Sequence, residues 1–186
     1  MKQKKIGVFV GSLRKGSYSK AIAKTLASMM SDEFEAEFVE IRDLPLFNQD
    51  FEEEGSTPVA YVDFRNQVSK LDGFLFVTPE YNRSYSAAIK NALDVGSRPF
   101  GQNLWSGKPG AIVSVSPGRY GGFGANHHLR QSMSFLNVFM MQQPETYIGD
   151  VSSMLDDQGN VQNERDQKFL MKIVKEFESW VNRFVD

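Results

Sequence analysis

The stretch that decides the fold reads Ile6-Gly7-Val8-Phe9-Val10, followed at once by Gly11-Ser12-Leu13-Arg14-Lys15-Gly16-Ser17-Tyr18-Ser19. The first five residues are a short apolar run, typical of a strand that is buried on both faces of a parallel sheet. The next nine are rich in glycine and serine, and apolar residues recur at helical spacing directly behind them. A buried strand, a glycine-rich turn and a helix in this order predict the first βα unit of an α/β fold.

Short apolar runs and helical segments go on alternating along the chain, as expected of βαβ units. The predicted strands are 6–10, 36–41, 73–77, 111–115 and 139–146, and the predicted helices are 19–30, 59–71, 86–95, 123–136 and 165–184. In the last helix we expect one buried apolar stripe, formed by Phe169, Ile173, Phe177, Trp180 and Phe184. The pattern predicts an α/β, flavodoxin-like fold: a doubly wound, five-stranded parallel sheet of order 2-1-3-4-5 with helices on both faces. We expect residues 1–186 to form one domain.

The composition restricts the classes of partner. The formal net charge is −2, the pI is about 5.8, and both signs of charge are scattered, so no basic surface for nucleic acid is indicated. There is no cysteine, which excludes disulfides, thiol catalysis and thiolate metal sites and fits a cytoplasmic protein. No run approaches the roughly 18 apolar residues of a membrane span. We therefore expect small-molecule partners and neither nucleic acid, nor membrane, nor a bound metal.

The first loop, residues 11–19, is a candidate phosphate site. Ligands of parallel α/β sheets bind at the carboxyl ends of the strands, and a helix amino terminus attracts phosphate. Hydroxyl donors would come from Ser12, Ser17 and Ser19, and a charged fork from Arg14. An ordinary serine cap on the helix is the alternative interpretation.

Two better-known phosphate motifs are absent from this loop. Its glycine spacing matches the start of a P-loop, but Ser17 and Tyr18 stand where that motif requires Lys and Ser/Thr. The dinucleotide pattern G-x-G-x-x-G fails as well, because Leu13 stands at the position of its second glycine. Nucleotide hydrolysis and a stably bound dinucleotide are therefore disfavoured.

A second candidate loop, Thr78-Pro79-Glu80-Tyr81-Asn82, follows the third predicted strand. Strands one and three flank the switch point of the sheet, so this loop should face the first across one crevice. We expect Pro79 to fix the turn, the Asn82 amide and backbone N–H groups to bond the polar edge of a flat ring, and Tyr81 to pack on it. A strand-ending turn with an exposed tyrosine is the alternative.

Together these residues resemble a known family. Gly11-Ser12-Leu13-Arg14 with Ser17, the run 78–82 with Ser84, and Ile89-Lys90-Asn91-Ala92-Leu93-Asp94 resemble the NADPH-dependent FMN reductases, which include bacterial quinone, chromate and azo-dye reductases. The resemblance implies that the first loop holds the FMN phosphate, and that the second loop and a third, residues 114–122, contact the isoalloxazine ring. The implied cofactor-binding residues are Ser12, Arg14, Ser17, Tyr18, Ser19, Pro79, Glu80, Tyr81, Asn82, Ser116, Gly118 and Gly121.

The chain departs from the family pattern at three positions. Ser19 stands where the family usually has Asn, Ser86 where Pro is common, and Gly124 where many members have Arg behind Gly-Gly. The first change keeps a phosphate donor. The other two bear on the substrate side or on the subunit contact.

The two histidines, His127 and His128, are adjacent on a predicted helix and therefore point in different directions, unlike an i, i+4 zinc pair. We expect no catalytic role for them. Residues 128–131 and Pro144-Glu145 resemble family segments of subunit contact, in which arginine and glutamate can pair, and independent surface charges are the alternative. The resemblance implies a homodimer or homotetramer.

The resemblance also implies an enzyme that reduces quinones, and possible further acceptors are chromate, azo dyes and free flavin. NADPH or NADH would bind transiently and give a hydride to flavin N5, and the acceptor would then use the same face of the ring. FMN carries this chemistry, so no side chain is expected to be catalytic, and Glu80 is expected to bind rather than to transfer a proton. An electron-carrying flavodoxin is the main alternative, although such carriers are usually strongly acidic. A flavin-free domain on the same fold is another.

Overall fold

The computed structural model describes residues 2–53 and 55–185, whose centre is a parallel sheet. Its strands β1 (Lys4–Val10), β2 (Phe34–Phe38), β3 (Gly73–Pro79), β4 (Pro109–Val115) and β5 (Phe139–Met140) follow the order 2-1-3-4-5. A further strand, β6 (Thr146–Ile148), also pairs with β4 in the parallel sense. The predicted strand order and the α/β, flavodoxin-like fold are confirmed.

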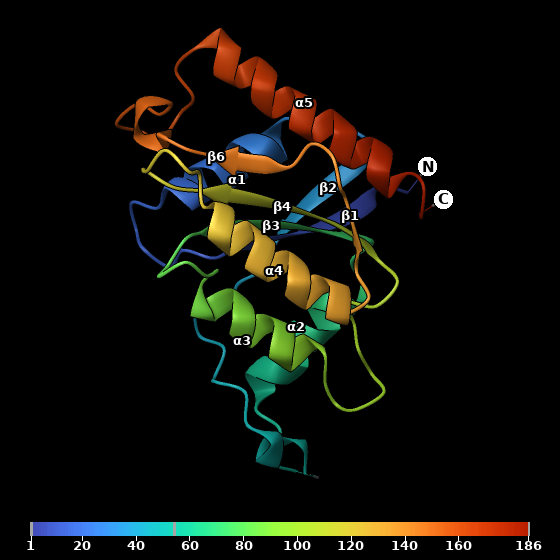
Figure 1. The fold of residues 1–186 in the computed structure, drawn as a ribbon. Coiled ribbons are helices and arrows are strands. Elements are labelled where there is room, and N and C mark those ends of the chain that lie inside the picture. Colours follow the sequence, from blue (N-terminus) through green and yellow to red (C-terminus); the bar gives the residue numbers. More distant parts are fainter. Residues whose placement is uncertain (1, 54, 186) are drawn as a thin grey trace.

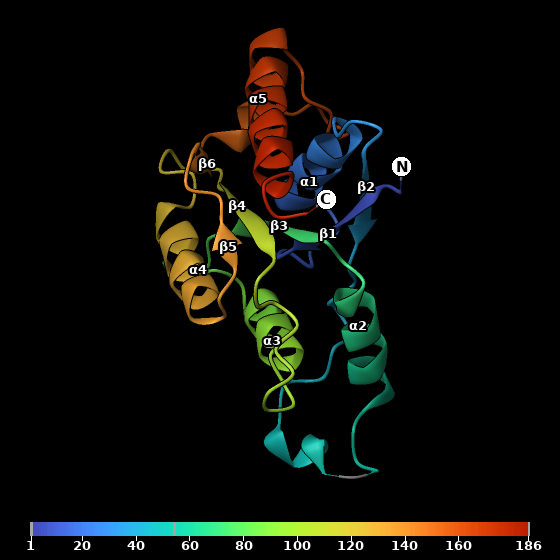
Figure 2. The same ribbon diagram turned by 90° about the vertical axis from the view of Figure 1, so that its right-hand side faces the viewer.

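Helices cover both faces of the sheet, as Figures 1 and 2 show. On one face lie α1 (Tyr18–Ser28) and α5 (Glu164–Val181), and on the other α2 (Val59–Ser69), α3 (Ala87–Gly96) and α4 (Phe123–Phe135). Successive strand residues point to opposite faces, so Ile6 and Val8 pack toward α1 and α5 while Phe9 packs toward the other helices. Short 3-10 turns span Gln49–Glu52 and Val151–Ser153.

The single strand predicted at 139–146 was wrong, because the structure has two short strands there. β5 pairs with the start of β4 and β6 with its end; the Met141 N–H still donates to the Gly110 carbonyl at 2.8 Å, and residues 142–145 belong to neither strand. Pro144 has no N–H to donate to a neighbouring strand, and Gln142 and Gln143 are exposed, so the paired run is interrupted here.

The buried stripe of α5 also differs from the prediction. It consists of Leu170, Ile173, Val174, Phe177 and Val181. Phe169 and Phe184 were wrongly assigned to it: each is 42% exposed. Phe169 lies on the flank of the apolar face, and Phe184 follows the end of the helix, where the helical spacing no longer fixes its direction.

An aromatic cluster fills the core under α2 and α3. Trp105 is fully buried, and its ring centroid lies 5.4 Å from that of Phe9 and 5.0 Å from that of Phe74. Its indole N–H donates to the Leu93 carbonyl at 3.0 Å, so the polar atom is satisfied. A Cβ on Gly96 would lie 2.6 Å from the indole ring, and therefore only glycine fits against it.

Trp105→Ala should lower the free energy of unfolding by about 3–5 kcal/mol, because it removes the largest fully buried side chain and leaves a cavity. Urea unfolding followed by far-ultraviolet circular dichroism measures the change. Phe100→Ala is the matched control: Phe100 is 89% exposed, and its loss should change stability by less than about 0.5 kcal/mol. Equal effects of the two substitutions would contradict this picture of the core.

Candidate functional site

The first and second candidate loops meet where β1 and β3 end. The Gly11 N–H donates to the Val77 carbonyl at 2.9 Å, which extends the pairing of the two strands by one bond. A Cβ on Gly11 would lie 2.9 Å from Pro79 Cδ and 2.8 Å from Ser86 Oγ. Only a glycine lets the first loop leave β1 this close to the second. Figure 1 shows the loops after β1, β3 and β4 gathered at one edge of the sheet.

The first loop ends as the amino-terminal cap of α1. The Ser17 hydroxyl accepts the Lys20 N–H at 3.1 Å, so the capping interpretation holds for this serine, whose hydroxyl proton remains available to a ligand. The N–H groups of Tyr18 and Ser19 belong to the first helical turn, which offers its N–H groups to ligands. Ser17 and Ser19 are both buried, whereas Ser12 is half-buried at the start of the loop.

Arg14 is held within its own loop. Its guanidinium donates to the Gly16 carbonyl at 2.5 Å and lies 5.6 Å from the centre of the Tyr18 ring. Beside this loop is a hollow of about 500 Å³, lined by Lys15–Tyr18, Lys20 and the turn Asp156–Asn160. Arg14, Lys15 and Lys20 thus lie near the start of α1, where the helix dipole is positive, while Asp156 and Asp157 line the opposite wall of the hollow.

The second loop is a tight β-hairpin. Tyr81 and Ser84 exchange backbone hydrogen bonds of 2.8 and 2.9 Å, and the two residues between them, Asn82 and Arg83, have φ of 49° and 69°. Two consecutive positive φ values define a type I′ turn, which favours glycine at its second position. An arginine there costs about 1 kcal/mol relative to glycine. The turn was expected at Pro79, but Pro79 is the last residue of β3.

Glu80 links the second loop to α4. One carboxylate oxygen accepts the Ala125 N–H at 3.0 Å, and the other lies 3.5 Å from a guanidinium nitrogen of Arg83. The residue that precedes α4, Gly122, has no side chain to cap it, so Glu80 supplies the acceptor from another element. A Cβ on Gly124 would lie 2.9 Å from the Arg83 carbonyl oxygen, which explains glycine at this position.

The third loop packs against the end of β6. Gly121 has φ of 59°, and a Cβ on it would lie 2.6 Å from the Tyr147 carbonyl carbon, so packing within the chain already requires glycine. The Gly121 carbonyl accepts the Ser114 hydroxyl at 2.7 Å. Ser116 accepts the Gly118 N–H at 3.0 Å, which orders the outer part of the loop.

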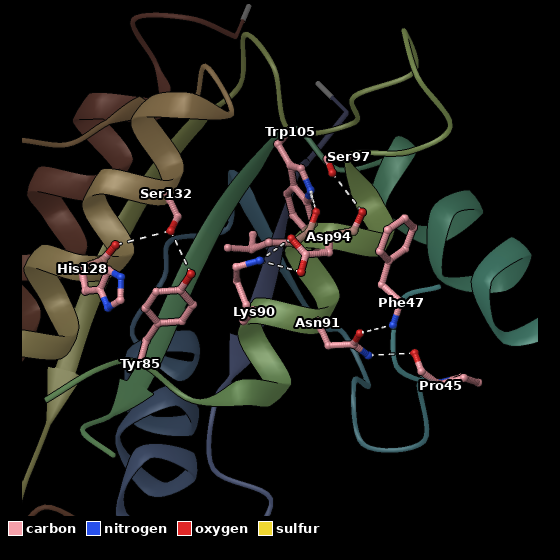
Figure 3. Close-up of polar contacts among 11 residues, drawn as sticks. Pro45, Phe47, Tyr85, Lys90, Asn91, Asp94, Ser97, Trp105, His128 and Ser132 are labelled. Carbon is pink, nitrogen blue, oxygen red and sulfur yellow. Dashed lines mark hydrogen bonds and ion pairs between the residues drawn. The ribbon is translucent and has the colours of Figure 1, made fainter. Parts of the chain in front are cut away.

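The two histidines support the loops in different directions, as expected from adjacent helical positions. His128 Nδ1 lies 2.8 Å from the Ser84 hydroxyl, and His127 Nε2 lies 2.9 Å from the Tyr147 hydroxyl. Burial, with the Glu145 carboxylate nearby, raises the pKa of Tyr147 to about 12, so its hydroxyl is protonated at neutral pH. Tyr85 also contacts α4, through the Ser132 hydroxyl at 2.8 Å (Figure 3). Sequence reasoning missed these contacts, since no motif signals them.

The segment Ile89-Lys90-Asn91-Ala92-Leu93-Asp94 has a structural role. The Asn91 amide accepts the Phe47 N–H at 2.7 Å and donates to the Pro45 carbonyl at 2.9 Å (Figure 3). It also donates to the Leu44 carbonyl at 3.0 Å. Asn91 is buried and thus fixes the loop after β2 against α3. Ile89 packs on the other side, under Gly11.

In the ranges 2–53 and 55–185, no group of three or more metal-binding side chains comes together, and no helix is long and apolar enough to cross a membrane. The candidate site is built from three loops, of which the second is a hairpin, and from the starts of α1 and α4. Its polar groups are backbone N–H groups, hydroxyls, one amide and guanidinium groups, a donor set that suits an anionic group joined to a polar ring.

The chain is similar to known reductases. Residues 4–152 match the model of the family described as NADPH-dependent FMN reductase. A quinone reductase of Pseudomonas putida is 51% identical over 176 residues, which are 95% of this chain and 94% of that relative. A 2-hydroxy-1,4-benzoquinone reductase of Burkholderia sp. is 44% identical, over 95% of this chain and 96% of the relative. Among solved structures, the flavoenzyme FerB, an NAD(P)H:(acceptor) oxidoreductase of Paracoccus denitrificans, aligns with a TM-score of 0.90 and 36% identity, covering 97% and 98% of the two chains.

Gly11→Ala should destabilise the protein by about 1–3 kcal/mol, because the new methyl group must displace the ring of Pro79 or the first loop itself. Gly16→Ala is the control from the same loop. A Cβ there meets no atom within 4 Å, so its stability should stay within about 1 kcal/mol of the wild type. Chemical unfolding of the cofactor-free proteins tests both, and the contact between the loops would be refuted if the two variants unfolded alike.

Proposed function

This chain belongs to the NADPH-dependent FMN reductase family, and on that premise we propose that it reduces quinones and related acceptors with NADPH or NADH through bound FMN. The observation that carries the proposal is the contact of the first loop with the second at Gly11. This contact places a helix start suited to a phosphate beside a hairpin suited to a ring. The proposal includes chromate, azo dyes and free flavin as further acceptors.

We propose that the phosphate of FMN lies at the start of α1 and its ring between the second and third loops. The first loop carries two basic residues and no acid, so it offers a net positive charge to a phosphate dianion. The residues that would hold the cofactor are those expected from the sequence: Ser12, Arg14, Ser17, Tyr18, Ser19, Pro79, Glu80, Tyr81, Asn82, Ser116, Gly118 and Gly121.

The side chains of this site orient and bind, while bound FMN supplies the two-electron redox chemistry. Glu80 is an example of a side chain that orients rather than reacts. Both of its oxygens are engaged, one by the Ala125 N–H and one by Arg83, and its side chain is only 16% exposed. These contacts support a role in positioning the loops. The relatives described above are reductases, which favours an enzyme over an electron carrier.

The purified protein should be yellow with about one FMN per chain, and anaerobic NADPH alone should bleach it, because family membership predicts direct reduction by the coenzyme. Initial rates at varied NADPH and fixed quinone concentrations should give parallel double-reciprocal lines, since one face of the ring would serve both substrates in turn. A colourless protein that takes up no FMN would refute the proposal. Bleaching by a protein reductase but not by NADPH would identify a carrier, and intersecting lines would refute the shared face.

We further propose that the chain forms a homodimer or homotetramer through a face on α4, β5 and α5. A hollow of about 630 Å³ lies there, lined by Arg130, Glu145, Phe139, Trp180 and other residues. Arg130 donates to the Met141 carbonyl at 3.0 Å, but its buried Nε has no partner among the described residues, and no ion pair joins it to Glu145 within the described chain. Glu145 of a second copy would bring a carboxylate to the half-buried Arg130 side chain, which lines the same hollow.

Glu145→Arg should shift the protein toward monomers in analytical ultracentrifugation, because it would place two like charges at the proposed contact. The double variant Arg130→Glu with Glu145→Arg should restore the assembly. Glu176→Arg, an exposed change on α5 away from this hollow, is the control. A monomeric wild type, or no shift in the single variant, would contradict the proposed face. One domain over residues 1–186 and a cytoplasmic location stay predictions.

A further inference from the structure

The hairpin between β3 and α3 carries an arginine where its backbone favours glycine. Arg83 has φ of 69° at the second position of the type I′ turn. Non-glycine residues kept in such a conformation concentrate at functional sites, where the side chain has a use that offsets the strain. The conformation of the turn therefore does not explain why residue 83 is an arginine.

Stability does not provide this explanation. The Arg83 side chain is 81% exposed and contacts Glu80 at 3.5 Å, and exposed ion pairs of this kind contribute little. Glu80 does not depend on it, because its other oxygen is already held by the Ala125 N–H. The ion pair instead directs the guanidinium toward the start of α4, the place where the second and third loops meet.

The three loops that would surround the cofactor carry a net positive charge. The three loops 11–19, 78–86 and 114–122 contain four basic residues, Arg14, Lys15, Arg83 and Arg119, and only one acid, Glu80. The first two lie at the start of α1, beside the proposed phosphate of FMN. Arg83 and Arg119 lie on the two loops that would flank the ring, and both are exposed. Neither is needed for the phosphate of the cofactor, so a second anionic group is the natural ligand.

We propose that Arg83, with Arg119, binds the phosphate groups of the reducing coenzyme while its nicotinamide lies over the ring. This inference rests on the proposed function. The chain has no G-x-G-x-x-G loop to hold a pyrophosphate, so the coenzyme must be bound by other groups. A guanidinium presents paired N–H donors that match phosphate oxygens, and an exposed arginine can exchange solvent for them at low cost.

The test compares coenzymes with and without phosphate on the FMN-loaded protein. Arg83→Gly should raise KM for NADPH about tenfold, because a charge-assisted phosphate contact of roughly 1.4 kcal/mol corresponds to that factor. With 1-benzyl-1,4-dihydronicotinamide, which has no phosphate, kcat/KM should change less than twofold. Calorimetric titration of the oxidised protein with NADP⁺ should show the same tenfold rise in Kd, without any turnover. Arg119→Gln should act in the same direction, and Arg83→Lys should recover part of the affinity.

Two controls separate binding from structure. Arg83→Gly removes the strain of the turn, so its unfolding temperature should equal or exceed that of the wild type. Lys175→Gln removes an exposed positive charge from the middle of α5 and should leave both coenzyme constants unchanged. If NADH loses as much affinity as NADPH, the contact is with the pyrophosphate; if only NADPH loses affinity, the contact is with the 2′-phosphate.

The proposal is overturned if Arg83→Gly leaves the Kd of NADP⁺ unchanged, if it impairs the phosphate-free donor equally, or if it lowers the unfolding temperature as a structural residue would. Failure of the proposed function looks different, because the wild-type protein itself would then neither bleach with NADPH nor bind NADP⁺. A wild type that oxidises NADPH and a variant that does so equally well would overturn the role of Arg83 alone.

Discussion

The close approach of Gly11 to Pro79 is the constraint on which the rest of the site depends. Parallel pairing of β1 and β3 brings their carboxyl ends together, and the missing side chain of Gly11 lets the first loop turn into α1 without displacing the second. The start of α1 is thereby held beside the hairpin. Neither loop would form a site alone: a helix start binds anions in general, and a hairpin with a tyrosine is an ordinary surface turn.

The second and third loops are joined by side chains rather than by the sheet. Glu80 caps α4 from the hairpin, while Tyr85 and the pair Ser84–His128 give further contacts with the same helix. Because Gly122 has no side chain to cap α4, Glu80 supplies the missing acceptor. The same bond holds the hairpin at a fixed distance from the loop that precedes α4. The three loops are consequently held by two kinds of interaction: backbone pairing joins the first loop to the second, and polar side chains join the second to the third.

The difference between these two kinds of interaction explains how much of the fold and of the candidate site the sequence could predict. Strand order and the position of the first loop follow from apolar runs and from the topology rules of parallel sheets, so they were predictable. The contact between Glu80 and Ala125 joins residues 45 positions apart, and no local pattern encodes it. The same holds for the stripe of α5: periodicity locates the helix, but the aromatic residues do not all lie on its buried face, since Leu170 and Val174 occupy it where larger side chains were expected.

The distribution of charge shows why whole-chain quantities say little about such a site. A net charge of −2 with both signs scattered along the sequence describes a nearly neutral protein. Folding brings the first, second and third loops, with Arg14, Lys15, Arg83 and Arg119, to one edge of the sheet. Glu80, the one acid of these loops, accepts a hydrogen bond from the start of α4 and pairs with Arg83. The local field that an anion meets depends on this arrangement and not on the sum. A chain that is nearly neutral overall can therefore still carry a net positive charge on the three loops that would hold a phosphate.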